Sequence, residues 1–150
     1  MAGSDKRDEL LRLDHQLCFP LYAATNLIQR LYRPLLEPLG LTYSQYLVML
    51  VLWNREPVSV GEIRQCLHLD IGTLSPLLKR MEKAGLVTRA RDPGDERRVL
   101  ISLTAHGRRL QADARSVPLA LASRIDAEPA ELEQLRRLST ALVDRLCQDA

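Results

Sequence analysis

Apolar residues recur at the spacing of an α-helix through most of the chain, and this pattern changes period only once. The first helical run extends from about residue 10 to residue 39, and Gly40 ends it. The next run, YSQYLVMLVLWN, is apolar nearly all round, which predicts a buried helix. Thr42 in front of it and Gln45 three residues later are typical of a capping box.

Two shorter helices are expected next. Ser59 and Glu62 repeat the capping-box pattern and open a helix over residues 60–69. A fourth helix follows Asp70-Ile71-Gly72, carries its leucines on one face, and ends at Gly85. The two helices are separated by only a few residues, as a helix-turn-helix unit requires.

The period then changes from helical to alternating. Residues 86–91 and 99–103 alternate apolar and polar side chains, and the turn-rich segment DPGDERR (92–98) lies between them. This pattern predicts a β-hairpin with a basic tip. Another long helix is expected from Thr104, and a last one from Pro129, since proline is tolerated in a first helical turn.

This order of elements predicts a mainly α fold with a small β-hairpin wing, a winged helix-turn-helix flanked by terminal helices. We expect a DNA-binding lobe over residues 41–103. The helices over residues 8–40 and 104–150 carry more leucine than one small domain needs, and burying it against a second copy would give a two-fold homodimer.

Composition excludes several classes. The 150 residues are 46% hydrophobic but contain no run of about 18 uncharged apolar residues, so no membrane span is expected. The first twelve residues, MAGSDKRDELLR, lack the apolar centre of a signal peptide. The three cysteines have neither disulfide-framework nor zinc spacing, so we expect no metal, no cofactor and a reducing, cytoplasmic location.

Positive charge is concentrated in the middle of the chain, which indicates a polyanion partner. Residues 64–109 carry ten Lys and Arg against five Asp and Glu, and both flanking segments are slightly acidic. The residues opposite the leucines of the fourth helix are candidates for DNA contact, although an ordinary solvated helix face has the same composition. These candidates are Thr73, Ser75, Pro76, Lys79 and Arg80.

The hairpin adds a second group of candidates. Arg97 and Arg98 are expected at its tip, where an arginine suits a narrow minor groove. Asp95, two residues earlier, is expected to hold the Arg97 guanidinium by a charge-assisted pair. Together with the helix, these residues predict binding to duplex DNA.

The segment GTLSPLLKRMEKAGLVTRARDPGDERRVLISLTAHG resembles the recognition helix and wing of the MarR family of bacterial regulators, with Asp95-x-Arg97 followed by Leu103-Thr104 and Gly107. The segment DHQLCFPLYAATNLIQRLYRPLLEPLGLTYSQYLVMLVLW resembles the branch that represses organic-hydroperoxide resistance genes. The resemblance covers roughly residues 10–110. It implies a non-enzymatic homodimeric repressor that binds an inverted-repeat operator and responds to organic hydroperoxides.

Cys18 is the candidate sensor on chemical grounds as well. Pro20 belongs in a first helical turn, so Cys18 is expected at a helix N-terminus, where the helix dipole favours thiolate. Thiolate attacks peroxides and becomes a sulfenic acid. Tyr22 follows one turn later, but Tyr32 lies about 21 Å along a straight helix and cannot reach Cys18 of its own chain.

The resemblance implies how the site is completed. Tyr32 and Tyr43 match tyrosines that donate hydrogen bonds to the reactive cysteine of the other subunit. Tyr22 fits a further tyrosine of that pocket, and Phe19 is expected in an apolar wall that favours organic hydroperoxides. The alternative is that these side chains are simply packed, as we expect for Tyr46, Trp53 and Cys66.

The fate of the sulfenic acid stays open at this stage. No cysteine occurs where some relatives of this branch carry a resolving one, which favours a one-cysteine type finished by a small thiol or by overoxidation. A bridge between Cys18 and Cys147 remains an alternative. Two rival functions are a repressor released by a phenolic or aromatic ligand and, from another class, a thiol peroxidase.

Overall fold

The computed structural model describes residues 8–148. Residues 1–7, from which part of the signal-peptide argument came, and residues 149–150 of the predicted C-terminal dimerisation segment lie outside the described residues. The elements are η1 (Leu13–His15), α2 (Cys18–Leu36), η2 (Glu37–Leu39), α3 (Tyr43–Asn54), β1 (Val58–Ser59), α4 (Val60–Leu67), α5 (Ile71–Lys83), β2 (Val87–Asp92), β3 (Asp95–Leu103), α6 (Ala105–Ala114), α7 (Val117–Ala122) and α8 (Pro129–Gln148).

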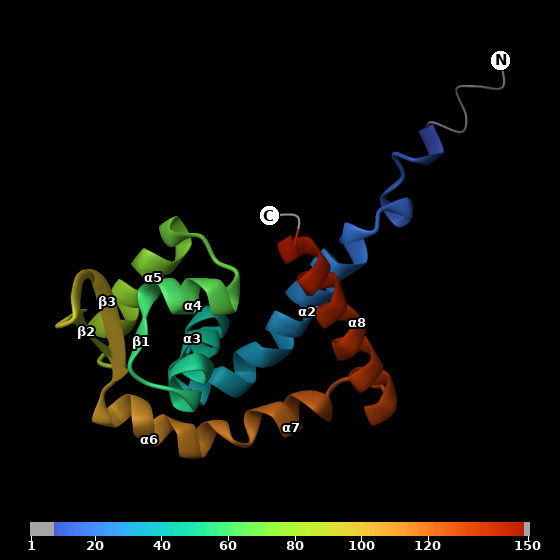
Figure 1. Ribbon diagram of the computed structural model, residues 1–150. Helices are drawn as coiled ribbons and strands as arrows, with labels where there is room; N and C mark the ends of the chain where they lie inside the picture. The colour runs from blue at the N-terminus through green and yellow to red at the C-terminus, as the bar shows by residue number, and fades with distance from the viewer. Residues whose placement is uncertain (1–7, 149–150) are drawn as a thin grey trace.

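The predicted winged helix-turn-helix is confirmed. Helices α3, α4 and α5 pack with a small antiparallel sheet of order β1-β3-β2 around one core (Figure 1). Both predicted capping boxes are present, at Thr42 for α3 and at Ser59 for α4. The apolar helix α3 lies in the middle of the core, where Val48 and Met49 have no exposed surface. Strand β1 was not predicted, because two residues are too short to show a period.

The hairpin turns earlier than predicted. The reversal occupies Pro93 and Gly94, and the Asp92 carboxylate accepts a hydrogen bond of 2.9 Å from the Gly94 N–H. Because this turn closes the hairpin in two residues, the following charged residues belong to β3. The prediction that Arg97 and Arg98 lie at the tip is therefore wrong, and both extend from the first half of β3.

Two helix boundaries also differ from the prediction. The first helix begins at Cys18 rather than near residue 10, with Pro20 in its first turn, where no N–H is needed. The long helix expected from Thr104 is divided into α6 and α7. Pro118 has no N–H to bond the carbonyl of Ala114, so α6 cannot continue through Pro118.

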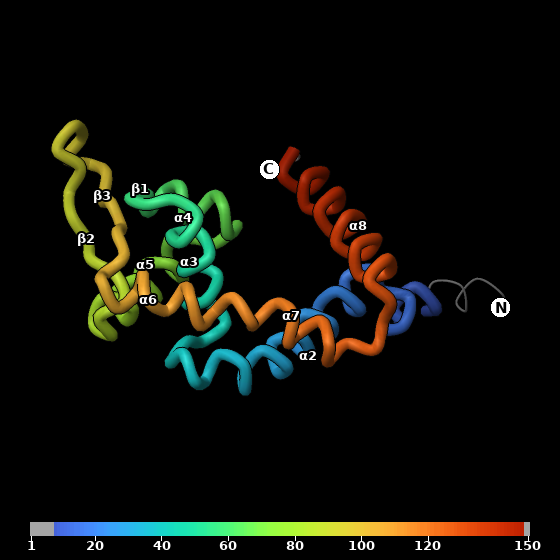
Figure 2. Tube along the Cα trace, turned by 90° about the horizontal axis from the view of Figure 1, so that it is seen from below, coloured from blue at the N-terminus to red at the C-terminus, as the bar shows by residue number. Residues whose placement is uncertain are grey.

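The terminal helices extend from the DNA-binding lobe rather than covering it. In Figures 1 and 2, α6 and α7 lead away from the wing toward α8, so the wing and α8 lie at opposite ends of the molecule. Helix α7 packs against α2. Leu36 is the one buried residue of α2, and α8 has none among its described residues. Within residues 8–148 no single helix is long and apolar enough to cross a membrane.

Candidate functional site

The outer face of α5 is formed as predicted. Leu74, Leu77 and Leu78 are buried, and the opposite residues Thr73, Pro76, Lys79 and Arg80 are exposed, with Ser75 half-buried. At the start of the helix the Asp70 carboxylate accepts a hydrogen bond of 2.7 Å from the Thr73 N–H. This cap fixes the end of the helix, so its basic side chains project from a rigid element.

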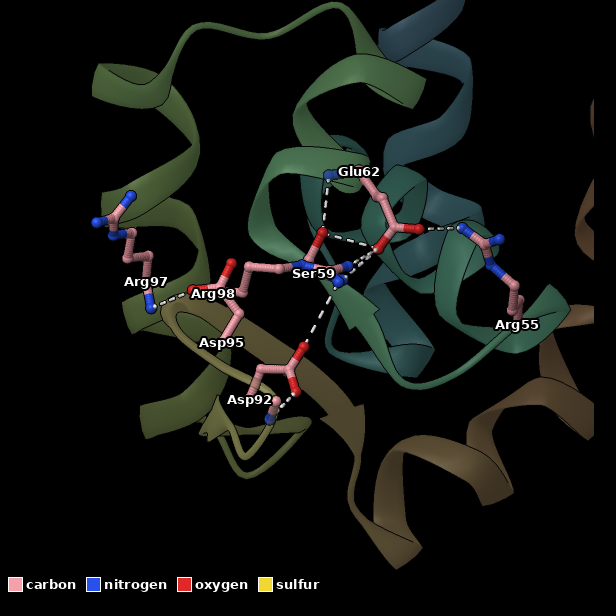
Figure 3. Close-up of polar contacts among 8 residues, drawn as sticks. Arg55, Ser59, Glu62, Asp92, Asp95, Arg97 and Arg98 are labelled. Carbon is pink, nitrogen blue, oxygen red and sulfur yellow. Dashed lines mark hydrogen bonds and ion pairs between the residues drawn. The ribbon is translucent and has the colours of Figure 1, made fainter.

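Glu62 connects the wing to the N-terminus of α4 (Figure 3). Its carboxylate accepts hydrogen bonds from the Ser59 N–H and hydroxyl and pairs with Arg55 at 2.9 Å and Arg98 at 3.4 Å. Arg98 also lies 3.5 Å from the Asp92 carboxylate. The hydrogen bonds from Ser59, then the charges of Arg55 and Arg98, keep the pKa of Glu62 below its ordinary value. The carboxylate is therefore charged at neutral pH and restrains Arg98.

Arg97 is held differently from what the sequence predicts. Asp95 accepts a hydrogen bond of 3.1 Å from the backbone N–H of Arg97 rather than from its guanidinium, which points away from Asp95 in Figure 3. The expected side-chain pair is thus wrong, since the carboxylate is used to shape the turn. The Arg97 side chain is exposed. Of the two wing arginines, it is Arg97 whose charge is directed to solvent.

An open hollow of about 520 Å³ lies between α4, α5 and the wing. Ser75, Arg97 and Arg98, predicted from separate segments, all line it, and so does Arg89, which was not predicted. Three guanidinium groups beside the recognition helix match the negative charge of a phosphate backbone. Arg89 is half-buried and lies on the same face of β2 as the buried Val87, and the alternating pattern gives no indication that it shares this hollow.

Cys18 is the first residue of α2 and is exposed. Tyr22, one turn later, is 68% exposed, and Phe19 is 38% exposed. These side chains surround the thiol in sequence, but none of them is enclosed within the single chain. The thiol therefore lies at a helix N-terminus, as predicted, with an incomplete apolar wall.

Tyr32 and Tyr43 come together, although they belong to different helices. Their ring centroids are 4.9 Å apart, and the Tyr32 ring lies 5.6 Å from that of Tyr46. Burial, and then the neighbouring Tyr43 and Tyr46, raises the pKa of Tyr32 to about 12, and burial also raises the pKa of Tyr43. Both phenols are therefore protonated at physiological pH and can donate hydrogen bonds.

The two halves of the predicted sensor are thus separated within one chain. The fourteen residues from Cys18 to Tyr32 span about 21 Å of helix at 1.5 Å per residue. Beside the tyrosines lies an open hollow of about 710 Å³ between α2 and the start of α3, which we call the α2–α3 hollow. Its lining includes Asn26, Arg30, Arg33, Leu36 and Tyr43.

The other two cysteines differ from expectation. Cys66 is exposed on α4, so its interpretation as a packed core residue is wrong. Cys147, near the end of α8, lies with its Sγ 3.6 Å from Nδ1 of His68, the residue that ends α4. Within residues 8–148, no group of three His, Cys, Asp or Glu side chains is placed to hold a metal ion.

Comparison with known proteins first defines the class. The family model described as transcriptional regulator SarA/Rot matches residues 30–114. The structure of reduced AbfR bound to DNA, a protein of Staphylococcus epidermidis, superposes with a TM-score of 0.78 at 36% identity, covering 95% of this chain and 97% of AbfR. Wild-type MarR from E. coli has a TM-score of 0.64 at 23% identity over 85% of this chain and 96% of MarR, a likeness of fold alone. The class is that of winged-helix, DNA-binding transcriptional regulators.

A closer relative defines the branch. The organic hydroperoxide resistance transcriptional regulator of Bacillus subtilis is 43% identical over 138 residues, which cover 92% of this chain and 94% of the relative. The chain belongs to the MarR family, in the branch of the organic hydroperoxide resistance regulators.

Glu62 is the main residue whose role the sequence did not reveal. Its capping box was predicted, but its ion pair with Arg98 joins residues 36 positions apart. Two local patterns, a capping box and a basic strand, carry no signal that they meet. Only the antiparallel pairing of β1 with β3, in which Ser59 lies opposite Leu100, brings them together.

Proposed function

We propose that this protein is a homodimeric repressor that leaves its operator when Cys18 is oxidised by an organic hydroperoxide. The observation that carries the proposal is the separation of an exposed thiol at a helix N-terminus from a cluster of protonated tyrosines on the same helix. If two copies place their α2 helices antiparallel, Tyr32 and Tyr43 of each copy meet Cys18 of the other. Each sensor site is then built from both chains.

The tyrosines and the helix N-terminus have complementary roles at this site. Phenol hydroxyls donate hydrogen bonds to the Cys18 thiolate, and the dipole of α2 stabilises the same negative charge. The thiolate attacks one peroxide oxygen, so an S–O bond forms while the O–O bond breaks. The alkoxide takes a proton and leaves as an alcohol, and Cys18 is left as a sulfenic acid.

We further propose that a small thiol completes the response. The thiol sulfur attacks the sulfenic acid, an S–S bond forms, and water leaves. AbfR has been solved overoxidised on DNA and, separately, with a disulfide formed. Because overoxidised AbfR is bound to DNA, we take a disulfide of Cys18 with a small thiol, rather than overoxidised sulfur, as the form of this chain to test for release.

On the DNA side, we propose the division expected from the sequence: residues 41–103 read DNA, and the flanking helices hold the dimer. Two recognition helices would enter successive major grooves about 34 Å apart. The proposed DNA contacts come from the outer face of α5 and from the wing. They are Thr73, Ser75, Pro76, Lys79 and Arg80 on α5, and Asp95, Arg97 and Arg98 on the wing. This role places the protein with the chromosome, in the cytoplasm.

The test is fluorescence anisotropy on the promoter DNA upstream of the protein's own gene. Reduced wild type and the Cys18→Ser, Cys66→Ser and Cys147→Ser variants are titrated with cumene hydroperoxide in the presence of a small thiol, and then with dithiothreitol. We expect release and reductant-dependent return for wild type, Cys66→Ser and Cys147→Ser, and no release for Cys18→Ser. Release of Cys18→Ser at the wild-type peroxide concentration would overturn the proposal, and loss of the response in Cys147→Ser would instead identify Cys147 as the resolving thiol.

A second candidate is release by an aromatic anion, which the α2–α3 hollow favours. Arg30, Arg33 and Tyr43 all line that hollow, so it offers both positive charge and an aromatic ring. The same anisotropy assay with salicylate separates the two functions, because a ligand mechanism needs no thiol. Release of Cys18→Ser by salicylate, with no response of wild type to peroxide, would favour this second candidate.

A further inference from the structure

A series of aromatic side chains leads from the candidate sensor across helix α3. The ring centroids of Tyr32 and Tyr46 are 5.6 Å apart, and those of Tyr46 and Trp53 are 6.3 Å apart in an edge-on arrangement. Tyr46 and Trp53 are seven residues apart, two turns of α3, and so lie on the same side of that helix. Tyr46 is almost fully buried, so a displacement of Tyr32 acts directly on a ring that is packed against its neighbours.

Trp53 ends this series in a single polar contact. Its indole Nε1 donates a hydrogen bond of 2.9 Å to the carbonyl oxygen of Gly107, 54 residues later in the chain. Gly107 is buried in the first turn of α6, directly after β3 and Thr104. The bond therefore joins the last turn of α3 to the element that follows the wing.

The first turn of α6 is itself fixed on the DNA-reading elements. A methyl group added at Gly107 would overlap the carbonyl oxygen of Leu86, so the two backbones are in direct contact. Thr104 bonds the same carbonyl through its N–H at 3.1 Å and bonds Gly85 through its hydroxyl at 2.6 Å. Gly85 and Leu86 connect the end of α5 to β2, and the Leu86 N–H bonds the carbonyl of Met81 within α5.

We propose that Trp53 is the positioning residue that couples the sensor tyrosines to the recognition helix and the wing. This inference rests on the proposed function, because it needs Cys18 to act on Tyr32 and Tyr43. When oxidised Cys18 no longer accepts their hydrogen bonds, the rings of Tyr32 and Tyr46 repack and displace Trp53. The Trp53–Gly107 bond then selects between two positions of the first turn of α6, and with it of the base of the wing.

A purely structural role for Trp53 makes a different prediction. In that case, removing the indole N–H lowers the stability of the fold but leaves the response to peroxide unchanged. If Trp53 couples the two sites, a protein without the indole N–H still binds DNA when reduced, and its Cys18 is still oxidised by peroxide. It then fails to leave the DNA. The readout that separates them is release measured at equal oxidation of Cys18.

The experiment compares wild type, Trp53→Phe and Met49→Leu. Trp53→Phe keeps a ring but removes the donor to Gly107, and Met49→Leu is a matched core substitution on α3 outside the aromatic series. For each, one portion receives cumene hydroperoxide and dimedone, which labels the Cys18 sulfenic acid, and a second portion receives cumene hydroperoxide and the small thiol before operator affinity is measured by anisotropy. We expect equal labelling in all three proteins. Oxidation should lower the operator affinity of wild type and Met49→Leu by the same factor, and this factor should be smaller by about 5- to 150-fold in Trp53→Phe.

A second measurement needs no variant. Trp53 is the single tryptophan of the chain, so the intrinsic emission of wild type reports its environment directly. We expect the emission maximum to shift when peroxide and the small thiol are added and to return with dithiothreitol. The inference fails, and the proposed function stands, if the emission is unchanged in protein that has released DNA. The same holds if Trp53→Phe is released from DNA as completely as wild type. Absence of dimedone labelling at Cys18 in wild type would instead overturn the proposed function, and the inference with it.

Discussion

The DNA-binding lobe and the terminal helices are stabilised in different ways. In the lobe, helices α3, α4 and α5 all bury side chains in the core, and each has a side-chain cap, provided by Thr42, Ser59 and Asp70 in that order. Helix α8 has no buried residue among those described, and Leu135 and Leu138 are 54% and 63% exposed. One region completes its core within the chain, whereas the other presents apolar surface that needs a partner.

This difference matches the two proposed tasks. A recognition helix must be held rigidly while the protein is on DNA, and a self-contained core achieves that. A sensor that moves two lobes relative to each other is better placed where the chain depends on its partner, because the interface between copies has more than one arrangement. The exposed position of Cys18 on α2 belongs with the second region.

The largest effect should come from the apolar face of α8. The double variant Leu135→Glu/Leu138→Glu places charges where a second copy is expected, and we expect a monomer in analytical ultracentrifugation. Because the second recognition helix is then no longer tethered, operator affinity should fall by about 10²- to 10⁴-fold. Circular dichroism serves as the control, since the core of the lobe is untouched. A double variant that stays dimeric would show that these leucines do not form the interface.

A core substitution in the lobe should behave in the opposite way. Leu78 on α5 is 1% exposed, and Leu78→Ala should lower the free energy of unfolding by about 2–5 kcal/mol through lost packing. In urea titrations, the decrease in the free energy of unfolding should be the same at low and high concentrations of protein, because the contacts that Leu78 loses are made within one chain. A decrease that varies with protein concentration would instead link the lobe to the dimer interface.

Sequence predicted the lobe well, because its signals are local. The capping boxes of α3 and α4, the buried stripe of α5 and the alternation of β2 and β3 all lie within short segments. The errors occurred where a proline or a turn outweighed periodicity. Pro118 divides α6 from α7, and the Asp92–Gly94 turn shortens the hairpin tip.

The candidate sites were less predictable, because they depend on contacts between distant segments. The order Cys18, Tyr32, Tyr43 was visible in the sequence, but the contact of Tyr32 with Tyr46 and the Trp53–Gly107 bond were not. Side chains on one helix face give a periodic signal. A hydrogen bond that joins residues 54 positions apart gives none.

The two wing arginines test this comparison within the lobe itself. Arg97 is directed to solvent, so Arg97→Ala should weaken operator binding by about 1–3 kcal/mol and reduce the salt dependence by about one phosphate contact. Arg98 already pairs with Glu62 and Asp92, so Arg98→Ala should change operator binding by less than about 1 kcal/mol. Anisotropy at several salt concentrations measures both. The assignment of the two side chains is reversed if Arg98→Ala is the more damaging change.

The smallest effect concerns the buried tyrosines that connect the two regions. The pKa of Tyr32 is about 12 in the folded chain and 10.0 ordinarily, so the folded state holds this proton more tightly than the unfolded state. Its contribution to stability is therefore complete below about pH 10 and is lost as the pH rises from about 10 to 12. Urea unfolding at fixed protein concentration between pH 8 and 11 should show a decline above pH 10 that is shallower in Tyr32→Phe. Leu78→Ala is the control, because it should lower stability at every pH without changing the slope above pH 10. A slope in Tyr32→Phe equal to that of wild type would mean that the Tyr32 phenol is not enclosed as the structure indicates.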